Sequence, residues 1–155
     1  ATHNLLLVHG YFDHAGIYNK LIDWALGAGC NVLIFDLPGH GLSSGARAEI
    51  DSFAHYGNAV RDVLRAVTLP DLPLCAIGQS TGCAALMELA RHNPWPFERT
   101  AFLAPLVRPA GWLGVRIAQT LLRPFTGSVV RKFNQNSSDL HFLDFIDNSK
   151  RGITN

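Results

Sequence analysis

The sequence lacks a dominant charge and has few cysteines, and these two absences exclude several classes of protein. Its 13 basic and 12 acidic residues leave a formal net charge of +1, which gives no field to attract nucleic acid. The three cysteines, Cys30, Cys75 and Cys83, show neither a CxxC pair nor metal-ligand spacing. We therefore expect no nucleic-acid partner, no disulfide framework, no metal and no organic cofactor.

Long hydrophobic runs are also missing. No uncharged stretch of about 18 apolar residues is present, so a membrane-spanning helix is not expected. The first residues carry no basic segment followed by an apolar stretch, as a signal peptide would. With so few cysteines, these absences favour a cytoplasmic location. The chain also begins without methionine and enters its first expected strand almost at once, which we interpret as a fragment of a longer polypeptide.

What the sequence does contain is an alternation of two kinds of apolar segment. Four short runs are typical of strands buried on both faces, and the segments between them repeat apolar residues every three or four positions, as helices do. This order predicts a parallel sheet between two layers of helices, a three-layer α/β sandwich. The expected strands cover residues 5–8, 32–35, 74–77 and 101–104, and the expected helices cover 17–28, a segment capped by Asp51, and 81–91.

A serine motif stands at the end of the third expected strand. Residues 78–82 read Gly-Gln-Ser-Thr-Gly and fit G-x-S-x-G, with a helix expected to follow. This context predicts a nucleophile elbow, a sharp turn that holds the hydroxyl of Ser80 out toward a base. Gly78 and Gly82 would remove the side chains that collide around such a turn. The alternative is an ordinary serine that only caps a helix.

The same edge of the sheet offers donors for an oxyanion. Ligands of parallel sheets bind at the carboxyl ends of the strands, where His9-Gly10, Asp36 and Ser80 all fall. Acyl transfer needs two preorganised donors, and we expect the backbone N–H groups of Thr81 and Tyr11 to supply them. Gly10 would let the loop turn so that Tyr11 faces the site, although His9-Gly10 could also be a plain strand ending.

Three other polar residues near this edge have two interpretations each. His40 could be a general base or a metal ligand, but it precedes Ser80, against the order serine, acid, histidine, so a role in shaping its loop is favoured. Asp36 also comes too early to be the acid and is interpreted as a hydrogen-bonding group of its loop. His14 either lines the site or caps the following helix.

Three motifs together resemble the monoacylglycerol lipase and lysophospholipase-like α/β-hydrolases. They are HGYFDH at 9–14, DLPGHGLSSG at 36–45 and GQSTG at 78–82, and the likeness extends over residues 4–110. It implies an α/β-hydrolase fold in which Ser80 forms an acyl-enzyme with a lipid-like carboxylic ester of monoacylglycerol or lysophospholipid type. The sequence departs from the family at Gln79, where histidine is frequent, and at Cys83, where a second glycine is frequent.

The resemblance also implies a fold that is incomplete on its C-terminal side. Residues 1–108 would form a partial core and 109–155 the start of a helical cap. Within the cap, apolar residues spaced by four predict a helix from 113 that ends at Pro124, and a second short helix is expected around 140–146. The family's acid and histidine follow later strands, and neither His92 nor His141 suits the role of the base. We therefore expect residues 1–155 alone to be nearly inactive and the rest of the fold to come from a longer chain.

Further hypotheses remain open at this point. A truncated, non-catalytic binding module and a peptidase or amidase of the same fold are alternatives to the esterase. The segment 109–132 mixes apolar residues with Arg116 and Arg123, which favours either peripheral contact with a membrane or packing of a helix on its own core.

Overall fold

The structure of the chain is a computed structural model that describes residues 1–105, 111–122, 141, 143 and 144. The chain divides between residues 106 and 107 into two compact units, which are described separately. The elements of the first unit are β1 (His3–Val8), η1 (Ala15–Ile17), α1 (Asn19–Gly27), β2 (Cys30–Ile34), α2 (Phe53–Ala66), β3 (Leu74–Gln79), α3 (Thr81–His92) and β4 (Arg99–Leu103). The second unit contains α4 (Trp112–Leu122).

The four strands form one parallel sheet in the order β2-β1-β3-β4. In the register of the central strand, Leu5 lies opposite Val32 on one side and Cys75 on the other. All four strands therefore end at the same edge of the sheet, which is the arrangement that the alternating sequence pattern predicts.

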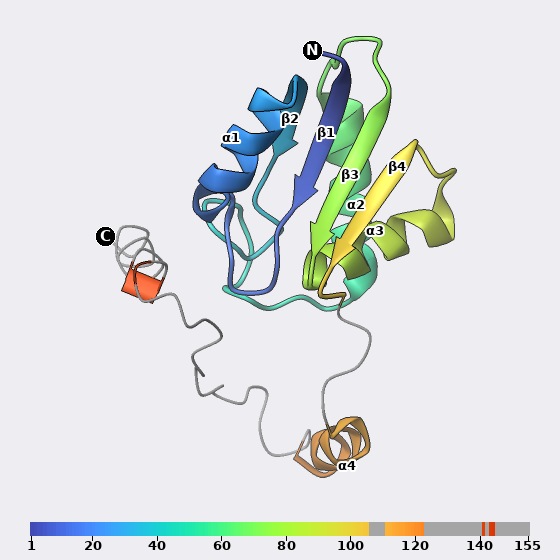
Figure 1. Cartoon of the computed structure of the whole chain (residues 1–155). Coiled ribbons are helices and arrows are strands. Elements are labelled where there is room, and N and C mark those ends of the chain that lie inside the picture. The colour runs from blue at the N-terminus through green and yellow to red at the C-terminus, as the bar shows by residue number, and fades with distance from the viewer. Residues whose placement is uncertain (106–110, 123–140, 142, 145–155) are drawn as a thin grey trace. The chain divides into compact units, whose positions relative to one another are not determined.

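Helices cover both faces of this sheet, as Figure 1 shows, with α1 on one face and α2 and α3 on the other. Alternate residues of β1 point to opposite faces. Leu6 belongs to the core cluster that contains residues of α2 and α3, and Leu7 belongs to the cluster that contains Ala25 of α1. The predicted three-layer α/β sandwich is thus confirmed, with the core divided between the two faces.

The outer strand β4 departs from the expectation that every strand is buried on both faces. Phe102 and Leu103 are 42% and 44% exposed, whereas Leu6 in β1 is fully buried. The reason is position, because β4 is the edge strand of the described sheet. The run of apolar residues at 101–104 correctly indicated a strand but not its exposure to solvent.

The start of α2 corrects one expectation about capping. The capping residue is Ser52, whose hydroxyl accepts the N–H of Ala54 at 3.3 Å, and not Asp51. Ser52 has the extended backbone of an N-cap and lies directly before the first helical residue, so it is the residue whose side chain reaches the unpaired amides.

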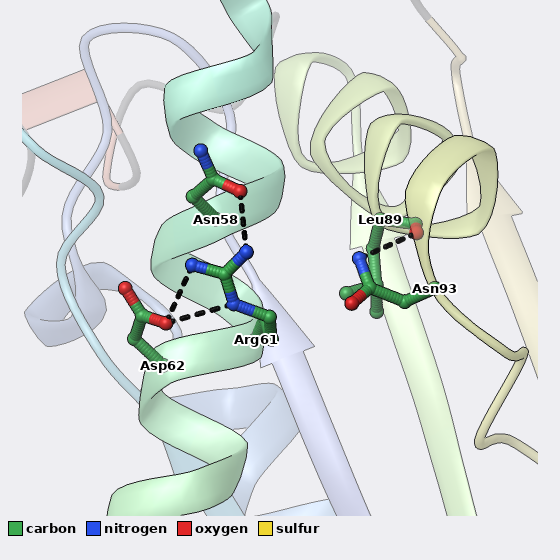
Figure 2. Close-up of polar contacts among 5 residues, drawn as sticks. All are labelled: Asn58, Arg61, Asp62, Leu89 and Asn93. Atoms are coloured by element: carbon green, nitrogen blue, oxygen red, sulfur yellow. Dashed lines mark hydrogen bonds and ion pairs between the residues drawn. The ribbon is translucent and has the colours of Figure 1, made fainter.

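Short polar contacts stabilise the outer parts of α2 and α3 (Figure 2). Arg61 donates to Asn58 at 2.9 Å and pairs with Asp62 at 2.8 Å on α2. At the end of α3, the carbonyl of Leu89 accepts both the backbone N–H of Asn93 at 3.0 Å and the side-chain amide of Asn93 at 3.1 Å. Among the described residues, no helix is long and apolar enough to cross a membrane.

Candidate active site

Ser80 occupies a sharp turn between β3 and α3. Its backbone is left-handed, with φ 50° and ψ −107°, a conformation that costs energy in any residue other than glycine. Its N–H donates to the carbonyl of Leu103 at 2.9 Å, which ties the turn to the end of β4. The side chain makes no capping hydrogen bond to α3. The strand, strained turn and helix are the geometry of a nucleophile elbow, and the helix-cap alternative receives no support.

The two glycines of the motif are required because neighbouring backbone atoms lie too close to leave room for a side chain. A methyl group at Gly82 would lie 2.1 Å from the carbonyl oxygen of Val8, so α3 begins directly against the end of β1. At Gly78 it would lie 2.9 Å from the backbone nitrogen of Cys83. The buried thiol of Cys83 donates to the carbonyl of Gly78 at 3.0 Å, and burial raises the pKa of this thiol. Cys83 thus acts as a packing residue beneath the turn.

The loop after β1 is held by the imidazole of His9. This side chain is fully buried; Nδ1 donates to the carbonyl of Gly10 at 2.7 Å, and Nε2 accepts the N–H of Leu37 at 2.8 Å. The N–H of Asp13 donates to the same Gly10 carbonyl at 3.2 Å. Because a trans peptide unit is planar, fixing this carbonyl also fixes the N–H of Tyr11 in the opposite direction. Tyr11 was the predicted oxyanion donor, and its orientation is therefore set by His9.

Sequence reasoning did not separate this role of His9 from that of a plain strand ending. The pKa of His9 is lowered to about 4, chiefly by burial, which outweighs the hydrogen bond to Gly10. The neighbouring His40 contributes in the same direction as burial. The imidazole is therefore neutral at physiological pH and serves as a rigid bridge. A histidine placed directly after a run of four apolar residues, 5–8, was the available signal for such a buried role.

The other polar residues of this edge shape the loops. His14 caps η1, with Nδ1 accepting the N–H of Gly16 at 3.2 Å. Asp36 reaches beyond its own loop, because Oδ1 accepts the N–H of Ala15 at 2.6 Å while Oδ2 accepts the N–H of Leu42 at 2.9 Å. The carboxylate therefore joins the loop after β1 to the loop after β2.

His40 is also buried, and its surroundings favour the structural interpretation. Its Nδ1 lies 3.0 Å from the carbonyl oxygen of Pro38. Its ring centroid lies 5.3 Å from that of His9 and 5.4 Å from that of Tyr11. Within the described parts of the chain, no group of three His, Cys, Asp or Glu side chains could hold a metal ion.

The structure brings the predicted residues to one edge of the sheet, with Gly10 and Tyr11 after β1 and Ser80 and Thr81 after β3. His92 stands at the other end of α3, and His141 belongs to the second unit. Of the expected segment 109–132, residues 111–122 are described, and the expected short helix around 140–146 lies largely outside the described residues.

Comparison with known proteins gives a consistent result. The family described as serine aminopeptidase, S33, matches residues 1–149. A monoglyceride lipase homolog of monkeypox virus is 33% identical over 108 residues, which cover 66% of this chain and 38% of that protein. Phospholipase YtpA of Bacillus subtilis is 27% identical over 113 residues, which cover 73% of this chain and 42% of that protein. This chain thus spans well under half the length of these relatives.

Among solved structures, the monoacylglycerol lipase of Paleococcus ferrophilus superposes with a TM-score of 0.65 at 21% sequence identity. The match covers 96% of this chain and 67% of that chain. At this identity the likeness establishes the fold alone, and it is the α/β-hydrolase fold that the three sequence motifs implied.

Proposed function

The chain belongs to the serine aminopeptidase S33 family of α/β-hydrolases, and from this we propose that the protein hydrolyses carboxylic esters with a lipid-like acyl chain, through an acyl-enzyme at Ser80. The observation that carries the proposal is the left-handed backbone of Ser80 between β3 and α3. A strained serine in this context is held for chemistry, because an ordinary helix cap has no need of the strain. The chain is distantly homologous to monoglyceride lipases, which supports an ester as substrate.

The proposed reaction follows from the positions of the groups. The hydroxyl oxygen of Ser80 attacks the ester carbonyl carbon, and the resulting oxyanion accepts the N–H groups of Thr81 and Tyr11. The general base takes the proton of Ser80 and passes it to the alcohol as the ester C–O bond breaks, and water then cleaves the acyl-enzyme, which releases the acid and restores the Ser80 hydroxyl. The general base is a residue other than His9, since Nδ1 and Nε2 of that ring are both engaged in hydrogen bonds to the backbone.

The apolar surface of α4, in the second unit, supports the proposal that the substrate has an apolar acyl group. Three side chains of α4 spaced by four residues are strongly exposed: Leu113 at 72%, Ile117 at 54% and Leu121 at 65%. Such a stripe suits contact with an apolar acyl chain or peripheral contact with a membrane surface. We propose a preference for medium or long acyl chains, with membrane contact through this segment as a further hypothesis.

An active-site phosphonate and a series of p-nitrophenyl esters test this function in the full-length protein. We expect mass mapping to find the label on Ser80 alone, and we expect Ser80→Ala to abolish both labelling and turnover. Rates should rise from acetate toward longer acyl chains. Labelling at another serine would refute the acyl-enzyme at Ser80, and a preference for acetate would refute the proposed preference for longer acyl chains.

A peptidase or amidase is the second candidate, because the family description names an aminopeptidase. The elbow serves ester and amide substrates equally, since both pass through a tetrahedral oxyanion. Aminoacyl-naphthylamide substrates distinguish the two. Labelling of Ser80 together with faster cleavage of these amides than of any ester would favour the peptidase, whereas a protein without labelling or turnover would favour the binding module.

A further inference from the structure

One side-chain hydroxyl lies between the two halves of the proposed oxyanion site. Tyr18, between η1 and α1, accepts the N–H of Gly10 at 3.2 Å. Its own O–H has two acceptors within reach, Oε1 of Gln79 at 3.2 Å and Oδ2 of Asp13 at 3.3 Å. The half-buried hydroxyl thus accepts one hydrogen bond and can donate its proton to either of two acceptors.

Two of the three partners of this hydroxyl adjoin the proposed reacting groups in the sequence. Gln79 directly precedes Ser80, and Gly10 directly precedes Tyr11. One oxygen atom therefore links the residue before the nucleophile to the residue before the oxyanion donor. The two come from different strands and lie far apart in the sequence.

The space around Gly10 shows how closely the two halves fit. A methyl group at Gly10 would lie 2.0 Å from Oε1 of Gln79 and 2.9 Å from Oδ2 of Asp13. The amide of Gln79 therefore lies directly against the backbone of the oxyanion loop. A hydrogen bond to the long side chain of Gln79 would by itself leave the oxyanion loop free to move. Together, the hydrogen bonds of Tyr18 and the close contact of Gln79 with Gly10 restrict that movement.

Building on the proposed function, we propose that Tyr18 is a positioning residue that sets the Tyr11 N–H relative to the hydroxyl of Ser80. Each of the two peptide units that meet at Gly10 is then fixed by one side chain. Tyr18 holds the N–H of Gly10, and His9 holds its carbonyl. Because Gly10 is the hinge between these units, loss of the Tyr18 bond loosens the His9–Gly10 unit, from which the unit that carries the donor is hinged. Tyr18 itself does not touch the substrate.

The protonation state of Tyr18 agrees with this role. Burial, reinforced by the carboxylate of Asp13, raises the pKa of the Tyr18 hydroxyl far above its usual range. The hydroxyl therefore stays protonated at physiological pH and keeps its proton for Gln79 or Asp13.

Tyr18→Phe tests the proposal in the full-length protein, because it removes one oxygen and keeps the ring. The matched control is Tyr56→Phe, since the buried hydroxyl of Tyr56 has no hydrogen-bond partner in the part of the chain that the structure describes. Two readouts are needed: kcat and KM on the best ester, and the amide resonance of Gly10 with its hydrogen-exchange rate.

For Tyr18→Phe we expect kcat to fall about tenfold with KM within about twofold, because misplacing a donor weakens transition-state binding more than ground-state binding. We also expect a shifted, faster-exchanging Gly10 amide, and no change in either readout for Tyr56→Phe. An unchanged Gly10 amide overturns the hydrogen bond, and a changed amide with unchanged kcat overturns the positioning role. If the wild-type protein is inactive and the phosphonate does not label it, the proposed function is overturned, and the catalytic role of Tyr18 with it. The Gly10 amide would still show whether the Tyr18 hydrogen bond forms.

Discussion

The backbone N–H of Leu37 donates to Nε2 of His9 at 2.8 Å, and this bond fixes the tautomer of a buried imidazole. Nε2 must be an acceptor, so the proton lies on Nδ1, where it is donated to the carbonyl of Gly10. One neutral ring thereby connects the loop after β2 to the loop that carries the proposed oxyanion donor. The connection requires the neutral ring, because a protonated Nε2 would face the Leu37 N–H.

The first prediction concerns pH. His9 has a folded-state pKa of about 4 against an ordinary value of 6.5, so its stabilising contribution is complete above pH 6.5 and is lost as the pH falls toward 4. The expected loss is about 3 kcal/mol in the free energy of unfolding. Urea unfolding at a series of pH values measures it, with His9→Gln as a non-titrating reference. The stability gap between the two proteins should narrow on acidification, and a gap that stays constant would contradict the prediction.

The second prediction concerns the backbone strain at Ser80. Glycine tolerates φ 50° and ψ −107°, whereas alanine does not. We expect Ser80→Gly to be more stable than Ser80→Ala by about 1 kcal/mol, although both variants lose the hydroxyl and all turnover. Thermal unfolding of the two variants side by side provides the measurement. Equal melting temperatures would mean that the turn stores no strain.

The elbow could be predicted from the sequence because its signal is local. Gly78, Ser80 and Gly82 fall within five consecutive residues, and the strand and helix that flank them have clear apolar periods. The parallel sheet was predictable for a similar reason, since each strand is a short apolar run. These features depend on neighbours in the chain, which a sequence displays directly.

The contacts that hold the site together could not be predicted in this way. Tyr18 meets Gln79 across 61 positions of sequence, and Asp36 meets Ala15 across 21. Such pairs depend on which loops the order of the strands brings together. The sequence predicts that Asp36 bonds within its own loop and gives no role to Tyr18, because nothing local distinguishes a bridging hydroxyl from an ordinary tyrosine at a helix start. The exposure of Phe102 was missed because it depends on the position of β4 in the sheet.

The third prediction concerns Asp36 as a bridge between loops. Its carboxylate accepts one N–H from Ala15 and one from Leu42, and a lost hydrogen bond to a charged group costs about 1.5–3 kcal/mol. Asp36→Ala should therefore destabilise the protein by at least about 2 kcal/mol, since two backbone donors lose their acceptor.

Asp62→Ala is the control for this experiment. Asp62 also forms an ion pair, with Arg61, but the Asp62 side chain is 63% exposed. Exposed ion pairs contribute less than about 1 kcal/mol to stability. Chemical denaturation of both variants makes the comparison. If Asp36→Ala proved as mild as Asp62→Ala, the bridge between the two loops would contribute nothing to stability.

The last prediction concerns the closeness of α3 to the end of β1. A methyl group at Gly82 would lie 2.1 Å from the carbonyl oxygen of Val8 and 2.8 Å from that of His9, and neither backbone atom can turn aside as a flexible side chain could. Gly82→Ala must therefore push α3 away from β1, at a cost of about 3 kcal/mol or more, and displace Ser80 from the oxyanion loop. Gly27→Ala is the matched control, because nothing lies within 4 Å of the added methyl group at the end of α1. That variant should be neutral or more stable by up to about 1 kcal/mol, since alanine favours the helix. Melting temperatures and the rate of phosphonate labelling at Ser80 test both variants together. A Gly82→Ala protein that melts and labels like the wild type would show that α3 can shift without disturbing the site, and the close packing of β1 against the elbow would then have no part in setting its geometry.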